Sequence, residues 1–129
     1  MGIAFIIILI HWVADFVLQT DKQAKGKSKN WTDLLSHTLT YSVVWLAVGL
    51  IWVILSNFNL TGLYVCDIWF VIKFTLITFI AHTTTDYFTS RLNSKLWSEN
   101  KVHLFFVSVG FDQLLHYGQL FLTYYILTK

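Results

Sequence analysis

Each of four apolar stretches in the sequence carries one histidine and one aspartate, four residues apart. The pairs are His11 with Asp15, Asp33 with His37, His82 with Asp86, and Asp112 with His116. Residues at i and i+4 share one face of an α-helix, so each pair presents an imidazole and a carboxylate one turn apart. Both groups are ligands for hard or borderline divalent cations, and such an ion offsets buried negative charge. The spacing therefore predicts a metal site where the four stretches meet.

The order within the pairs reverses from one stretch to the next. The first and third stretches read His then Asp, whereas the second and fourth read Asp then His. If consecutive helices cross a membrane in opposite directions, every Asp lies nearer the same surface and every His lies one turn deeper. At a rise of about 1.5 Å per residue, His11 and His82 lie about 12 Å and about 14 Å before the ends of their stretches. We therefore expect the pairs to meet at one level, and we interpret 1–55 and 67–128 as two similar, duplicated hairpins.

The expected metal ligands are His11, Asp15, His37, His82, Asp86, Asp112 and His116. They outnumber the four ligands of one tetrahedral zinc ion, and they suit two ions bridged by a carboxylate and holding a water. Such a pair generates hydroxide near neutral pH. The candidate catalytic residues are Asp15, Asp86 and Asp112, of which one would bridge the ions and another would take a proton from the attacking water. Zinc is preferred on ligand type, with manganese and iron as alternatives.

Three further polar residues are candidates for orienting a ligand or a substrate. Gln19 falls two turns after His11, and Gln113 follows Asp112. Asp33 stands near the start of its helix, where a solvated carboxylate favoured by the helix dipole explains it equally well. An alternative for the whole cluster is hydrogen bonding between helices, at roughly 0.6 kcal/mol for each pair. We favour the metal site, because ionisable groups inside a membrane are costly and usually functional.

The composition predicts an integral membrane protein. Of the 129 residues, 56% are hydrophobic and 12% are charged, against about 25% charged in soluble domains. We expect a single all-α transmembrane domain, 1–129, built as a four-helix bundle with helices at about 2–19, 31–55, 67–91 and 102–127. The chain has no proline, so no sharp kink is predicted. A single cysteine, Cys66, excludes an internal disulfide and a cysteine metal cage.

Positive residues set the expected orientation in the membrane. They gather in the first and third connections, as Lys22, Lys25, Lys27, Lys29, Arg91, Lys95 and Lys101. The second connection, 56–66, has no Lys or Arg. By the positive-inside rule the first and third connections face the cytoplasm and both termini lie outside. We therefore expect a multi-pass protein of the bacterial cytoplasmic membrane.

Four pieces of sequence carry a resemblance to a known family. HWVADFVLQTD, LLSHTLTY, AHTTTDYF and FDQLLH resemble a domain family of unknown function that comprises small four-span membrane proteins of bacteria and their phages. That family is similar to the membrane-bound metal-dependent hydrolases. The H-x-x-x-D pairs also resemble those of the all-α zinc-dependent phospholipase C and nuclease group. The second resemblance implies phosphoester hydrolysis at a centre of several zinc ions.

The leading hypothesis is a membrane-embedded metal-dependent hydrolase with a dinuclear His/Asp site in the cytoplasmic half of the bundle. The expected substrate is a phosphate ester, either a lipid head group or a nucleotide-like molecule. The loop lysines would attract such anions, at about 1 kcal/mol each near the surface. The alternative is a divalent metal-ion transporter or a subunit of one, which uses the same H-x-x-x-D pairs. Membrane lipids are the expected partners, a homo-oligomer is compatible with the pattern, and a nucleic-acid duplex is not expected.

Overall fold

The computed structural model describes residues 2–58 and 67–129, and within these ranges it contains helices and no strand. The elements are α1 (Gly2–Trp12), the π-helical segment η1 (Val13–Val17), α2 (Asp21–Gly26), α3 (Trp31–Asn57), α4 (Ile68–Ser98) and α5 (Val102–Leu127). The all-α class is thereby confirmed for the described residues. Cys66 and most of the second connection, 59–66, lie outside the described residues.

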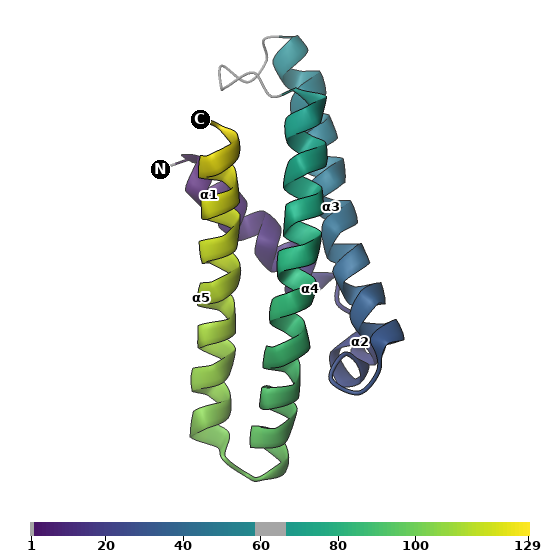
Figure 1. Cartoon of the computed structure of the whole chain (residues 1–129), viewed down its shortest axis with the longest axis vertical. Helices are drawn as coiled ribbons and strands as arrows, with labels where there is room; N and C mark the ends of the chain where they lie inside the picture. Colours follow the sequence, from purple (N-terminus) through teal and green to yellow (C-terminus); the bar gives the residue numbers. More distant parts are fainter. Residues whose placement is uncertain (1, 59–66) are drawn as a thin grey trace.

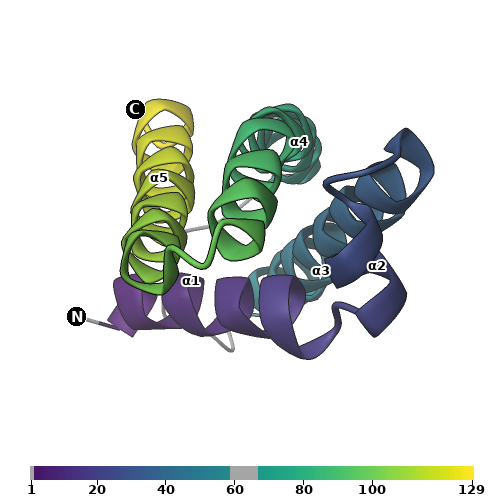
Figure 2. The ribbon, with the colours of Figure 1, turned by 90° about the horizontal axis from the view of Figure 1, so that it is seen from below.

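The long helix α4 lies between α3 and α5 and packs against both (Figure 1). The helix α1 crosses this layer obliquely and contacts α3 and α5, as the view along the bundle shows (Figure 2). Both ends of the chain lie toward one end of the bundle, whereas α2 and the α4–α5 connection lie toward the other (Figure 1). This arrangement turns one side of α1, η1, α3, α4 and α5 toward a shared interior.

The helices differ in detail from the four expected ones. The first stretch is α-helical only to Trp12, and π-helical turns then carry the chain to Val17 instead of a straight helix to residue 19. The third stretch continues to Ser98, beyond the expected end at residue 91. The second stretch also runs two residues further than expected, to Asn57. The absence of proline removes one cause of irregularity in a helix but not the π-type turn, which is another.

An unexpected short helix, α2, occupies the basic connection. It begins at a capping box, in which the Thr20 hydroxyl accepts from the Gln23 backbone N–H and the Gln23 side chain accepts from the Thr20 N–H. This reciprocal pair satisfies two donors that a helix start otherwise leaves free. The next helix, α3, begins with a simpler cap, in which the Asn30 side chain accepts from the Asp33 N–H at 2.8 Å. Local capping therefore fixes how the chain enters and leaves α2.

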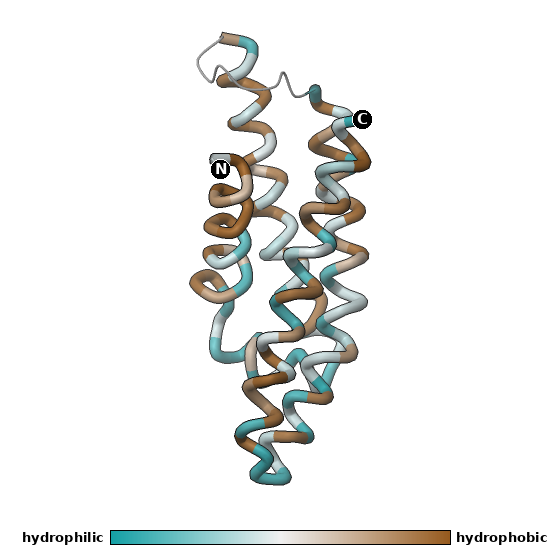
Figure 3. The backbone as a smooth tube through the Cα atoms, turned by 90° about the vertical axis from the view of Figure 1, so that its left-hand side faces the viewer, coloured by the Kyte–Doolittle hydropathy of each residue, from teal (hydrophilic) through white to brown (hydrophobic). Residues whose placement is uncertain are grey.

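The bundle is more polar inside than outside. Large hydrophobic side chains such as Phe5 and Phe88 are about two-thirds exposed, at 67% and 66%, whereas the buried residues include every ligand expected from the sequence. Figure 3 shows hydrophobic residues along α1 and hydrophilic ones around the α4–α5 connection. Soluble proteins bury their apolar residues and rarely bury Asp. The exposed apolar side chains and the buried ionisable ones thus differ from this usual pattern.

Two of the described helices, α3 and α4, are long and apolar enough to cross a membrane. The apolar segment Gly2–Val17 is shorter than such a span. Length and composition thus support two of the four expected spans, and the four-span bundle stays a prediction. A layer of buried apolar residues from all the long elements holds the bundle together: Ile7, Ala14, Tyr41, Trp45, Phe74 and Leu120.

The close approach of α3 and α4 depends on Gly49. A Cβ atom at this position would lie 2.6 Å from Cγ1 of Val71 on α4, and the branched valine cannot swing away. We expect Gly49→Ala to destabilise the protein by about 1–3 kcal/mol, the usual effect of overpacking. Gly110 of α5 is the matched control, since a Cβ there meets nothing within 4 Å. Thermal unfolding in detergent micelles, followed by circular dichroism, measures both; equal stability of the two variants would contradict the expectation.

Candidate metal centre

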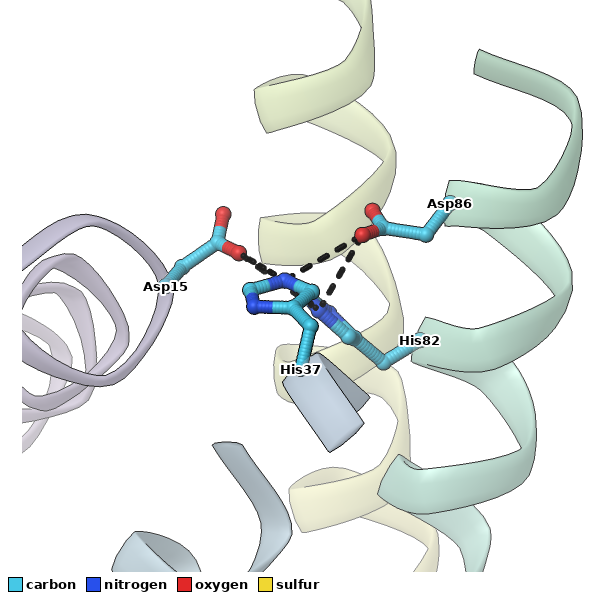
Figure 4. Close-up of side chains that lie close together, drawn as sticks. All are labelled: Asp15, His37, His82 and Asp86. Atoms are coloured by element: carbon cyan, nitrogen blue, oxygen red, sulfur yellow. Dashed lines mark hydrogen bonds and ion pairs between the residues drawn. The ribbon is translucent and has the colours of Figure 1, made fainter. Parts of the chain in front are cut away.

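Four buried side chains from three elements point toward one another (Figure 4). Asp15 comes from η1, His37 from α3, and His82 and Asp86 from consecutive turns of α4. One ligand atom of each lies within 4.8 Å of those of the others. The i, i+4 spacing on α4 therefore does what the sequence predicts: it places an imidazole and a carboxylate on the same face.

Five of the six separations in this first group are close to those between the corners of a tetrahedron, and the sixth, between the Asp15 and Asp86 oxygens, is within 4.8 Å. His37 Nε2 lies 3.1 Å from Asp15 Oδ1 and 3.2 Å from Asp86 Oδ2. His82 Nε2 lies 3.5 Å from Asp15 Oδ1 and 3.8 Å from Asp86 Oδ2, and the two Nε2 atoms are 3.2 Å apart. Ligands about 2.0–2.2 Å from a tetrahedral zinc ion lie roughly 3.3–3.6 Å from each other. The donor set and its spacing fit one four-coordinate divalent cation.

A second group consists of Asp86, Asp112 and His116, and it offers three ligand atoms. His116 Nε2 lies 3.2 Å from Asp86 Oδ1 and 3.3 Å from Asp112 Oδ1. Within the described part of the chain, Asp112 Oδ1 is buried and makes no hydrogen bond, and its polar neighbour is the His116 imidazole. A buried carboxylate oxygen without a hydrogen bond is costly, and a cation between it and the imidazole would lower that cost. With three ligands, a four-coordinate ion keeps one position for water or a substrate.

Asp86 belongs to both groups, and it uses a different oxygen for each. Its Oδ2 faces His37 and His82, while its Oδ1 faces His116. A carboxylate with this arrangement bridges two cations. The geometry therefore gives the two expected ions unequal surroundings: one closed set of four ligands and one open set of three.

Gln113 aligns the two non-bridging carboxylates. Its amide nitrogen donates to Asp112 Oδ2 at 3.1 Å and to Asp15 Oδ2 at 3.3 Å. The other oxygen of each carboxylate, Oδ1, is thereby left to face the imidazoles of the two groups. The Gln113 carbonyl oxygen lies 2.8 Å from His11 Nε2, and His11 Nδ1 lies 2.8 Å from the Tyr41 hydroxyl. These contacts agree with the orienting role expected for Gln113, which stays a prediction.

The structure places His11 beside the ligand groups and outside both of them. Its two ring nitrogens face Gln113 and Tyr41, and its Nε2 lies 3.6 Å from Asp15 Oδ2. Because Gln113 also contacts Asp15, the contacts of His11 support the position of that carboxylate. A role as a direct ligand remains a prediction from the sequence.

The other two orienting candidates lie in different places. The Gln19 amide nitrogen lies 3.2 Å from His37 Nδ1, so Gln19 contacts a ligand of the first group. Asp33 lies at the start of α3, where it accepts from the Asn30 side chain at 2.9 Å. Its other neighbour is Lys22, at 3.8 Å. The contacts of Asp33 therefore match the first-turn alternative rather than a place in the ligand groups.

Tyr41 contributes to the centre although the paired His and Asp residues did not point to it. Its ring stacks on His82 with centroids 3.9 Å apart and an angle of 7° between the planes. Tyr41 follows His37 by four residues on α3, so the i, i+4 rule could have placed it on the same face. The Nδ1 atoms of His82 and His116 lie 3.2 Å apart, which leaves their Nε2 atoms to face the two ligand groups.

Lys27 also reaches the centre, from the turn that follows α2. Its Nζ donates to Asp86 Oδ2 at 2.8 Å, and its side chain is 18% exposed. Burial alone lowers the pKa of Lys27, but the negative charges of Asp86 and Asp15 outweigh this effect and hold the pKa above its ordinary value. Lys27 is therefore charged at neutral pH. The sequence shows it as one of four loop lysines and contains no signal that separates it from the others.

The sequence of nearly the whole chain matches one known family. Residues 3–129 match the family described as Protein of unknown function (DUF3307). The chain belongs to this family. No curated protein and no solved structure matches it. Membership of a domain family of unknown function is thus confirmed, while the resemblance to metal-dependent hydrolases and an origin in bacteria or phages stay predictions.

Metal content distinguishes the two ligand groups. We expect about two divalent ions in each wild-type chain, as in a dinuclear site. Asp112→Asn should retain about one ion, because only the three-ligand group loses a member, whereas Asp86→Asn should lower the content below one because both groups lose a ligand. Elemental analysis of protein purified without chelators provides the measurement. Asp21, with a side chain that is 98% exposed, gives the control Asp21→Asn; an unchanged metal content in Asp86→Asn would refute the shared ligand.

The role of Gln113 can be tested separately from that of the ligands. Gln113→Leu removes the donor that aligns Asp15 and Asp112 but leaves all ligand atoms in place. Loss of such an orienting partner typically weakens metal affinity about 10- to 100-fold. We expect that decrease in a chelator-competition titration, with the full metal content recovered at saturating metal. An affinity equal to that of the wild type would show that the amide does not align the carboxylates.

Proposed function

We propose that this protein is a membrane-embedded hydrolase that uses two divalent cations to cleave a phosphate ester. The observation that carries the proposal is the position of Asp86, which offers one oxygen to a four-ligand group and the other to a three-ligand group. A cation at the three-ligand group would polarise a phosphoryl oxygen and lower the pKa of the attacking water, and a second cation across the shared carboxylate would add positive charge beside it. The ligand types favour zinc, with manganese or iron as alternatives.

In this proposal the closed group has a structural role and the open group binds the reacting phosphate. The set of Asp15, His37, His82 and Asp86 completes a tetrahedron and has no further position to offer. The set of Asp86, Asp112 and His116 leaves one. Asp112 belongs to that open set and does not bridge the two groups, so it is our candidate for taking the proton of the attacking water, through Oδ2, the oxygen that faces Gln113. Water adds to phosphorus, the P–O ester bond breaks, and the leaving oxygen receives a proton.

The proposed setting is the cytoplasmic half of a four-span bundle with both termini outside. Three observations support it: the apolar exterior, the two helices that meet the requirements for spans, and the gathering of α2 and the α4–α5 connection at one end. That end carries the loop lysines, which favour the cytoplasmic side. Substrate would then reach the centre from the inner surface of the membrane, where both lipid head groups and soluble phosphate esters occur.

Phosphate release decides the proposal. Purified protein in detergent micelles should release inorganic phosphate from at least one phosphate ester in a panel of phospholipids and nucleotides. Chelation should stop the release and zinc should restore it. His116→Ala and Asp112→Asn should reduce it to background, because the open group then lacks a ligand, whereas the exposed control Asp21→Asn should leave it unchanged.

The same variants test the transporter alternative. Protein reconstituted in sealed liposomes should move no metal ion if the closed group holds its ion structurally. Flux of zinc that depends on His37 and His82, with no phosphate released from any ester, would overturn the hydrolase proposal and favour the carrier.

A further inference from the structure

Lys27 differs from the neighbouring lysines in the way the fold holds it. The side chains of Lys22 and Lys25 on α2 are 81% and 79% exposed, whereas that of Lys27 is 18% exposed and reaches the shared carboxylate of Asp86. A surface lysine usually keeps its ammonium in water. The position of Lys27 therefore needs a structural cause.

The turn between α2 and α3 supplies that cause. Gln23, held by the capping box, donates to Ser36 Oγ on α3 at 3.0 Å and so fastens α2 to the longer helix. Gly26 lies against the first turn of α3, where a Cβ atom would overlap the Asp33 carboxylate. The Lys27 backbone N–H donates to the Gln23 carbonyl at 2.9 Å. These contacts fix the backbone of Lys27 beside the centre, where its side chain reaches Asp86 Oδ2.

Charge balance shows what Lys27 does when the centre is loaded. Three carboxylates face the centre, those of Asp15, Asp86 and Asp112. They balance three of the four positive charges of two divalent ions, which leaves one positive charge, and Lys27 adds a second. Asp86 would then have both oxygens on cations, so the ammonium no longer has a carboxylate of its own. With two metal ions bound, the centre would therefore carry excess positive charge next to Lys27, which an anion could balance.

We propose that Lys27 binds the phosphoryl group of the substrate, and that it exchanges Asp86 for that group when the metal ions are present. The proposal rests on the hydrolase function above, since it needs the two ions and an anionic ligand. A lysine ammonium is a compact point charge with three donors and binds phosphate well. The group that Lys27 recognises is the phosphoryl oxygen itself, which a lipid head group, a soluble ester and inorganic phosphate all share.

Binding of inorganic phosphate tests the proposal without requiring turnover. In metal-loaded protein, Lys27→Gln should weaken phosphate binding about 10- to 100-fold, the range that loss of a hydrogen bond to a charged group gives. Lys27→Arg should retain most of the affinity, because it keeps the charge. Lys25→Gln is the matched control, since Lys25 carries the same charge on α2 but is 79% exposed. Isothermal titration of protein in micelles measures all four proteins.

Metal-free protein gives the second readout. Without metal ions, the Lys27 ammonium is bonded to Asp86 and does not bind phosphate. Lys27→Gln should therefore not change the phosphate affinity of metal-free protein. A merely structural role of Lys27 would lower the metal content or the stability of the variant instead, and both are measured alongside. Titration with phosphatidic acid in the same micelles separates the sources of the phosphoryl group. A loss confined to phosphatidic acid would support a lipid head group as the ligand, and a loss confined to inorganic phosphate would support a free phosphate.

Two outcomes overturn the inference. One is an equal affinity of metal-loaded wild type and Lys27→Gln for both inorganic phosphate and phosphatidic acid; the other is an equal loss in Lys27→Gln and Lys25→Gln, which reflects general attraction by the loop. Failure of the hydrolase function looks different. In that case phosphate binds through Lys27 as described, yet no ester in the panel releases phosphate.

Discussion

The burial of three carboxylates inside an apolar bundle is the constraint on which the rest of the structure depends. Asp15, Asp86 and Asp112 are 4%, 1% and 8% exposed, and an isolated buried carboxylate is expensive to keep ionised. Imidazoles surround them, and the ammonium of Lys27 offsets part of their charge. Removing one partner from such a cluster leaves an unbalanced charge in a medium that screens it poorly. Divalent cations at the two ligand groups would balance the negative charge of the cluster. The burial of the carboxylates is therefore an argument for the metal hypothesis.

The fold answers this constraint by bringing each group in from a different direction. The position of α4 between α3 and α5 lets His82 and Asp86 face both of these helices, so the shared carboxylate comes from the middle helix of the layer (Figure 2). The segment η1, which continues the oblique α1, brings Asp15 in from another side. A layer of apolar residues covers one end of the cluster, and the turn with Lys27 covers the other. The ligands thus come together because their helices pack side by side at the level of these residues, and not because the ligands are neighbours in the sequence.

The sequence predicts the helical class and most of the residues that gather, because both follow from local periodicity. An i, i+4 pair on a regular helix must share a face, so the pairing of His82 with Asp86 and of Asp112 with His116 follows from their spacing alone. The same rule does not say whether a residue at the end of a helix faces the bundle interior or the preceding chain. Asp33 satisfies the spacing, yet at the first turn of α3 its contacts are with the preceding chain. The positions of Lys27 and α2 were not predicted, because they depend on tertiary contacts made by a connection and not on local periodicity.

The π-helical turn that carries Asp15 limits which sequence changes this protein can tolerate. Asp15 stands in the π-helical segment Val13–Val17, and it is the ligand that does not sit on a regular α-helix. A π-type turn widens the helix locally, so the direction of Asp15 depends on the number of residues in this segment. Deleting a single residue there would rewind the chain by about 100° and aim the carboxylate away from its partners. Insertions and deletions should therefore be excluded from this stretch, while substitutions on its exposed side remain free.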